Sequence, residues 1–240
     1  SPFMRWTALV LVASMMFFAY MFVDMLSPLK ELLDTTLNWN STTFGTYAAS
    51  EYFLNVFCFF LIFAGIILDK MGIRFTGLLS ASLMVIGACI KFYAMSDWFV
   101  GTGLESWLNS WWVDLPGSAK LACFGFMIFG CGCEMAGTTV SKAIAKWFKG
   151  KEMAMAMGLE MSIARLGVFA AMWVSPMMSE AFNNSVSAPV AFGAVLLMIG
   201  LIFYFVFVLM DRKFDAQLEA AGELKEEASE EEFKFSDLGK

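Results

Sequence analysis

Six long runs of apolar residues alternate with shorter polar segments along the chain. The runs cover residues 6–27, 43–68, 74–96, 119–145, 152–178 and 187–210. Each holds about 20 residues or more, the length that an α-helix needs to cross the hydrocarbon core of a bilayer. Helices pair their own backbone groups, as the bilayer interior requires. The pattern therefore predicts an all-α membrane protein whose residues 1–210 form a six-span bundle.

The segments between and after the runs differ in character. Residues 28–42 are polar with helical spacing, and residues 97–118 are rich in tryptophan, as is typical of a segment at a membrane interface. Residues 211–240 hold ten of the 22 acidic residues but only five of the 16 basic ones, so most of the net charge of −6 lies there. We expect residues 211–240 to form an acidic cytosolic linker, in which residues 214–232 are either solvated and amphipathic or partly disordered.

Composition supports this interpretation and excludes several classes of function. The chain is 59% hydrophobic and 16% charged, whereas soluble domains carry about 25% charged residues. It contains no histidine and no pattern that pairs a nucleophile with a base, so we expect neither an enzyme nor a nucleic-acid partner. Cys131 and Cys133 form a C-x-C pair without further ligands, and we therefore expect no metal and no cofactor.

Lysine and arginine residues are unevenly divided between the two sides of the predicted bundle. Nine lie on the side that carries both chain ends, and three lie on the other. Because cytosolic loops carry the excess of positive residues, both ends are expected in the cytosol. The short loops and the lack of cysteines in the outer segments favour a prokaryotic inner membrane.

The link between the second and third runs carries the charged motif GIILDKMGIR, which contains Gly65, Asp69, Lys70, Gly72 and Arg74. In sequence and in position it resembles the loop motif of the major facilitator superfamily. The resemblance implies that these residues form a gate, in which the aspartate and the arginine belong to a charge network that latches the cytosolic face. A partly exposed pair of this kind contributes only about 0–1 kcal/mol, which suits a switch.

Three charged residues lie too deep in the runs to reach water easily, namely Glu134, Glu160 and Arg165. Glu134 lies 13 residues before Trp147, about 19 Å along a helix, and Arg165 lies 14 residues after Lys151, about 21 Å along the next one. The two are therefore expected at one depth on antiparallel helices. They either pair with each other to fix packing or face a cavity and bind the two ends of a zwitterionic substrate. Charges near the midplane of transporters favour the second interpretation.

The other charges in the runs have less specific interpretations. Asp24, Glu51 and Lys91 lie near the outer ends of their runs, where we expect them to reach the interface. Glu160 is about 140° away from Arg165 around its helix; it is a candidate for proton coupling or for contact with neighbouring helices. The glycines around residue 134 either allow close helix packing or leave room for a cavity.

Residues 146–167, KWFKGKEMAMAMGLEMSIARLG, carry a more specific resemblance, to the lysosomal dipeptide transporters within the superfamily. That group has a glutamate 31 residues before the arginine of an Ala-Arg-[Leu/Ile]-Gly unit, as Glu134 precedes Arg165 here. The resemblance implies that these two residues hold the ammonium and the carboxylate of a dipeptide. The first run is also similar, in a Tyr-x-x-x-Asp arrangement that adds Tyr20 and Asp24 to the substrate site.

Members of the superfamily have twelve spans in two six-span halves, so the resemblance implies that this chain is the N-terminal half. We expect a membrane transporter that works by alternating access with a C-terminal six-helix half and carries small zwitterionic solutes, dipeptides above all. A eukaryotic member would be expected in the lysosomal membrane. Two alternatives stay open. One is a proton-coupled transporter of an organic or inorganic anion, with Glu134 as proton carrier; the other is a membrane scaffold that transports nothing and binds a partner through its acidic tail.

Overall fold

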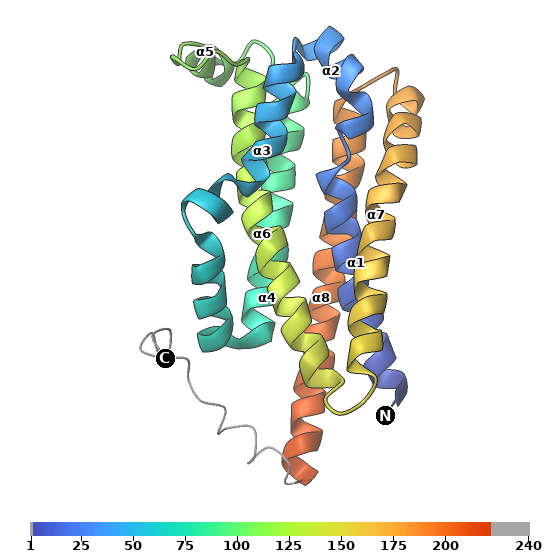
Figure 1. Ribbon diagram of the computed structural model, residues 1–240. Helices are drawn as coiled ribbons and strands as arrows, with labels where there is room; N and C mark the ends of the chain where they lie inside the picture. Colours follow the sequence, from blue (N-terminus) through green and yellow to red (C-terminus); the bar gives the residue numbers. More distant parts are fainter. Residues whose placement is uncertain (1, 222–240) are drawn as a thin grey trace.

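The chain folds into a bundle of long helices that run roughly along one axis (Figure 1). This computed structural model describes residues 2–221. Its helical elements are α1 (Pro2–Val23), the 3-10 helix η1 (Ser27–Leu29), α2 (Lys30–Leu37), α3 (Ser41–Phe57), α4 (Phe60–Met95), α5 (Gly103–Asn109), α6 (Gly117–Trp147), α7 (Met153–Ala181) and α8 (Ser187–Ala221). The N-terminus and the α6–α7 connection lie at one end, called here the N-terminal end, and α2 and α5 lie at the opposite end (Figure 1).

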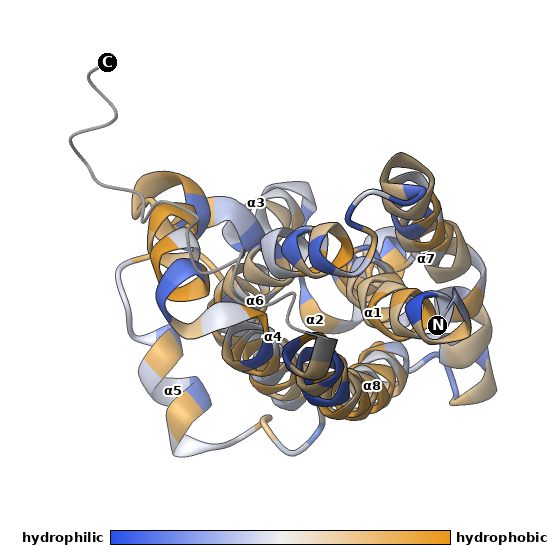
Figure 2. Cartoon of the chain, turned by 90° about the horizontal axis from the view of Figure 1, so that it is seen from below, coloured by the Kyte–Doolittle hydropathy of each residue, from blue (hydrophilic) through white to orange (hydrophobic). Residues whose placement is uncertain are grey.

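Five helical segments are long and apolar enough to cross a membrane. They are Pro2–Leu37, Phe60–Met95, Gly117–Trp147, Met153–Ala181 and Ser187–Ala220. Large apolar side chains such as Ile62, Trp173 and Ile202 are exposed on the outside of the bundle, and the end-on view is dominated by apolar residues (Figure 2). Such a surface suits contact with lipid. The prediction of an all-α membrane protein is therefore confirmed.

The second predicted run, 43–68, is not one continuous helix. α3 ends at Phe57, and Phe59 has a φ of 52°, so the helix is interrupted before α4 begins at Phe60. With 17 residues, α3 is shorter than a membrane-crossing helix usually is. A left-handed backbone is unfavourable for phenylalanine, and nothing in the run FLNVFCFF indicates a break there. The prediction of an unbroken span is therefore wrong at this element.

α4 contains a reversal of the chain in its interior. Gly72 has φ 74° and ψ 173°, a backbone conformation that is almost restricted to glycine. The chain turns back there, so that α4 has two arms (Figure 1). The predicted link between the second and third runs lies at this glycine, and the second arm ends at Met95, within one residue of the predicted end of the third run.

The last helix extends beyond the predicted end of the bundle. α8 continues through residue 210 to Ala221, so the predicted linker 211–240 begins as a helix. Asp211, its first residue, is fully buried, so the packed part of α8 extends past residue 210. The remainder of that predicted linker, residues 222–240, lies outside the described residues.

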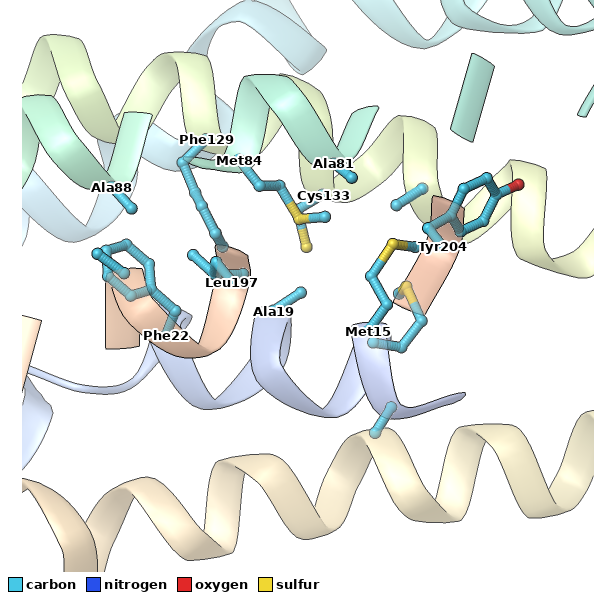
Figure 3. Close-up of a cluster of buried hydrophobic side chains, with 14 of the residues drawn as sticks. Met15, Ala19, Phe22, Ala81, Met84, Ala88, Phe129, Cys133, Leu197 and Tyr204 are labelled. Atoms are coloured by element: carbon cyan, nitrogen blue, oxygen red, sulfur yellow. The ribbon is translucent and has the colours of Figure 1, made fainter. Parts of the chain in front are cut away.

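Side chains from four helices fill the centre of the bundle. Phe22 of α1, Met84 of α4, Phe129 of α6 and Leu197 of α8 meet in one apolar cluster (Figure 3). α4 packs closely on α6, and a Cβ added at Gly87 of α4 would overlap the α6 backbone. α7 packs mainly on α1 and touches α6 only slightly, and α1 lies between them in the end-on view (Figure 2).

Candidate functional site

Arg165 and Tyr20 lie against each other across the contact between α7 and α1. A Cβ added at Gly167 would overlap the carbonyl oxygen of Phe17, so this close approach of the two helices requires glycine. The guanidinium carbon of Arg165 lies 5.2 Å from the centroid of the Tyr20 ring, which is a cation–π geometry. The arginine is otherwise exposed and lines a shallow, open hollow along α7.

Glu134 projects from α6 beside two glycines that meet other helices. A Cβ added at Gly130 would overlap the carbonyl oxygen of Glu51 on α3, and one added at Gly132 would lie 2.6 Å from the carbonyl oxygen of Ser80 on α4. These glycines therefore allow close helix packing. Glu134 follows Gly130 by about one helical turn, which places this half-buried carboxylate on the side of α6 that turns towards α3.

Three of the predicted site residues gather around a fourth, Tyr20. Glu134, Glu160 and Arg165 are all within electrostatic range of it. Glu160 is only 8% exposed, in agreement with its predicted depth. Within residues 2–221, no ion pair joins Glu134 to Arg165. The two opposite charges thus do not serve as a packing pair, and each is left without a charged partner.

Asp24 lies apart from this group. Its carboxylate follows the end of α1 and accepts a hydrogen bond from the Ser27 hydroxyl at 3.1 Å. Its electrostatic neighbours are Tyr47, Glu51 and Lys91. The predicted Tyr-x-x-x-Asp arrangement is therefore divided between two clusters, with Tyr20 in one and Asp24 in the other.

Lys91 and Glu51 are buried, although they were expected to reach the interface. Lys91 is 0% exposed and Glu51 is 3% exposed. The lysine Nζ lies 4.3, 4.6 and 5.1 Å from the ring centroids of Phe22, Phe126 and Tyr47, and it has no hydrogen-bond acceptor in the described part of the chain. The expectation is wrong at both positions, because rings from α1, α3 and α6 surround Lys91 and α6 packs against Glu51.

The charged motif binds two other helices at the N-terminal end of the bundle. Asp69 forms an exposed ion pair with Lys142 of α6 at 2.7 Å. Arg74 forms an ion pair with Asp211 of α8, with 2.6 Å from its Nε to the carboxylate. Asp69 and Arg74 thus have separate partners, and within residues 2–221 they do not pair with each other.

The remaining motif residues have distinct environments. Gly72 supplies the positive φ at the reversal of the chain. Gly65 lies in regular helix with open space beside it, and Lys70 is exposed. The backbone conformation therefore explains why residue 72 is glycine. Nothing in the described structure requires glycine at residue 65.

Asp211 is the centre of a charge network that the hydrophobic pattern did not identify. Its carboxylate accepts hydrogen bonds from Arg74, from Lys146 Nζ at 3.0 Å and from Trp147 Nε1 at 2.9 Å. Asp215, one turn later, also forms ion pairs with Arg74 and Lys146. The i, i+4 spacing places the two aspartates on one face of the helix; like charges at this spacing disfavour an isolated helix, and Arg74 and Lys146 compensate them here.

Comparisons with a family model and with individual proteins point to the same family. A family model described as Major Facilitator Superfamily matches residues 12–237. Over 165 residues the chain is 28% identical to the lysosomal dipeptide transporters MFSD1 of Pongo abelii and Homo sapiens, and over 164 residues it is 27% identical to that of Danio rerio. These matches cover 68% of this chain but only 31% of the length of the relatives. No solved structure matches the chain.

Proposed function

Because this chain belongs to the Major Facilitator Superfamily, we propose that it is the N-terminal half of a twelve-helix transporter that works by alternating access. α3 and the first arm of α4 would form the second span, and the second arm would form the third, which gives six spans with both ends in the cytosol. A C-terminal six-helix half would cover the face that carries Arg165. Substrate would bind between the two halves, as is typical of such transporters.

We propose small zwitterions, dipeptides first among them, as the substrates. The observation that carries this proposal is the presence of two opposite charges, Glu134 and Arg165, near one tyrosine and without an ion pair between them. Charges inside a membrane are costly unless they are compensated, and a substrate with an ammonium and a carboxylate would supply a partner to each. A guanidinium binds a carboxylate through two parallel hydrogen bonds. The name of the relatives, lysosomal dipeptide transporter, supports the same class.

The proposal is tested by blocking one end of the dipeptide at a time. In titrations of the full-length transporter, Ala-Ala should bind, whereas N-acetyl-Ala-Ala and Ala-Ala amide should each bind about tenfold more weakly or worse, because each loses one charge-assisted hydrogen-bonded contact. The Glu134→Gln variant should no longer distinguish Ala-Ala from its acetylated form. The Arg165→Gln variant should no longer distinguish Ala-Ala from its amide.

Glu180 provides a matched control, because it is an exposed carboxylate elsewhere on α7. The Glu180→Gln variant should keep both discriminations. Suppose instead that Glu134→Gln retains the discrimination against the acetylated dipeptide but loses proton-driven uptake in liposomes. Glu134 would then carry a proton, and its assignment to the ammonium would be wrong.

We also propose that the charged motif acts as a latch at the cytosolic end. Asp69 ties the loop to α6 through an exposed ion pair with Lys142, and Arg74 ties it to α8 through the buried Asp211. The exposed pair is weak, so it can open and close as the two halves move, while the buried pair holds the loop to α8. The partners of the motif lie on two helices, α6 and α8, so a movement of α8 would reach the loop.

A further inference from the structure

α3 and α6 lie against each other in a constant register. Both helices run from the end of the bundle that holds α2 and α5 towards the N-terminal end (Figure 1). Three contacts between the two segments join residues whose numbers differ by 79. They are the hydrogen bond from the Trp39 indole to Ser118, the stacked rings of Tyr47 and Phe126, and the close approach of Glu51 to Gly130. Parallel helices rise equally per residue, so the same offset continues along the contact.

This register places Asn55 opposite Glu134. Asn55 lies one turn beyond Glu51 on α3, and Glu134 lies one turn beyond Gly130 on α6. Residues four positions apart share a face of a helix, so the two side chains continue the faces that meet at Glu51 and Gly130. Asn55 is accordingly buried, with 6% of its surface exposed. Glu134 is half-buried and lies at the edge of the contact.

The amide of Asn55 has only one of its two ends satisfied. Its Nδ2 donates a hydrogen bond to the carbonyl oxygen of Glu51 at 3.4 Å, whereas its buried Oδ1 has no donor among the residues that the structure describes. The ionised carboxylates of Glu134 and Glu51 are acceptors and supply none. Lys91 Nζ lies against the Tyr47 ring, two turns of α3 away. An unpaired buried acceptor is unfavourable, so this oxygen needs a donor from outside the described residues.

The surroundings of the Asn55 oxygen favour a cation as that donor. Asn55 lies in the last turn of α3, which ends at Phe57, and the C-terminal end of a helix carries a partial negative charge. Glu134 adds a carboxylate on the facing helix. An ammonium has several N–H groups, so it can donate one to the carboxylate and another to the amide oxygen.

We propose that Asn55 is a second binding residue for the substrate ammonium, beside Glu134. When the ammonium binds, the amide oxygen accepts one N–H while the carboxylate accepts another. The terminal torsion of asparagine is soft, so the oxygen turns towards the ammonium without a movement of α3. This inference rests on the proposed function and adds a requirement to it. The substrate ammonium must have at least two N–H groups, as in a primary amine or an N-terminal proline.

The test compares two isomeric substrates of equal charge. N-ethyl-Ala-Ala and N,N-dimethyl-Ala-Ala contain the same atoms, but the ammonium of the first has two N–H groups and that of the second has one. The dissociation constants of both are measured by titration of the full-length transporter, and their ratio is the readout. The dimethyl isomer should bind about tenfold more weakly, because one hydrogen bond to a charged group is lost. Equal binding of the two isomers, with Ala-Ala bound, would overturn the inference and leave the proposed function intact.

Substitution of Asn55 assigns the effect to its oxygen. Asn55→Leu approximately keeps the volume of the side chain and removes the acceptor, so the two isomers should bind about equally. Asn55→Ala, which suits a helix, is a second variant with the same expected result. Thr76→Val is the matched control, because Thr76 Oγ1 on α4 is also buried and has no partner in the described part of the chain. This variant should keep the preference for the ethyl isomer.

Two further results separate the inference from the function on which it rests. Both Asn55 variants should still bind Ala-Ala more tightly than its amide, because Arg165 is unchanged; this shows that the site is folded. If they also kept the full preference for the ethyl isomer, crowding around the ammonium would explain that preference and the inference would be wrong. A failure of Ala-Ala to bind the unsubstituted protein would contradict the proposed function, and the inference with it.

Discussion

Asp211 and Lys91 are both fully buried charged residues, but their surroundings differ in kind. Asp211 accepts hydrogen bonds from two cationic side chains and one indole, whereas Lys91 is surrounded by rings and has no acceptor in the described residues. A satisfied network of this type stabilises one arrangement of its helices. The removal of its buried centre leaves the two cations, Arg74 and Lys146, with only the partly exposed Asp215 to compensate them. At the residue scale, the two sites therefore respond differently to loss of charge.

Asp211→Asn should lower the free energy of unfolding by about 3 kcal/mol, because it removes the central acceptor of a buried network and leaves Arg74 and Lys146 close together. Chemical denaturation in detergent measures the change. Asp215→Asn is the matched control: this side chain is 27% exposed, and its loss should cost about 1 kcal/mol or less. Equal effects of the two substitutions would contradict the central role of Asp211.

At the scale of elements, the predicted runs agree with the helices where the length and the hydrophobicity of a segment are enough to determine its structure. The runs 119–145 and 152–178 lie within α6 and α7, because a long apolar segment can satisfy its backbone only as a helix. The interruption at Phe59 was not predictable, since a positive φ is unfavourable for phenylalanine and the apolar residues around it contain no glycine or proline that would mark a break. The reversal at Gly72 was predictable, because a glycine between polar residues marks a turn.

The two glycines of the charged motif should respond in opposite ways to the same substitution. Gly72→Ala should destabilise the protein by about 1–3 kcal/mol, because its positive φ is strained for any residue with a Cβ. Gly65→Ala should be neutral or stabilise by about 0.5–1 kcal/mol, since that position is helical with open space beside it. Thermal unfolding of both variants checks this; destabilisation by Gly65→Ala would indicate a contact that this chain alone does not contain.

At the scale of the whole molecule, the depths of Glu134 and Arg165 were predictable from counting along two helices, and the structure brings both near Tyr20. The order of the helices around them was not predictable. Whether α7 packs on α6 or on α1 depends on contacts between distant parts of the chain, and so does the burial of Lys91. Periodicity in one segment contains no information about which other segment will cover it.

The orientation of the molecule can be tested with introduced cysteines. Trp112 is 95% exposed beyond α5, and Lys70 is exposed at the other end of the bundle. With the exposed thiols Cys58 and Cys89 replaced by serine, Trp112→Cys should react with a membrane-impermeant maleimide in intact cells. Lys70→Cys should react only after permeabilisation, because positive residues are retained in the cytosol. The reverse pattern of labelling would show that the proposed orientation in the membrane is wrong.

α1 lies between the helices that carry the two opposite charges of the candidate site (Figure 2). α7 is attached to the rest of the bundle mainly through α1, whereas α6 packs mainly on α4. A tilt of α1 would therefore carry Arg165 with it and leave Glu134 in place, so the separation of the two charges would follow the movement of α1.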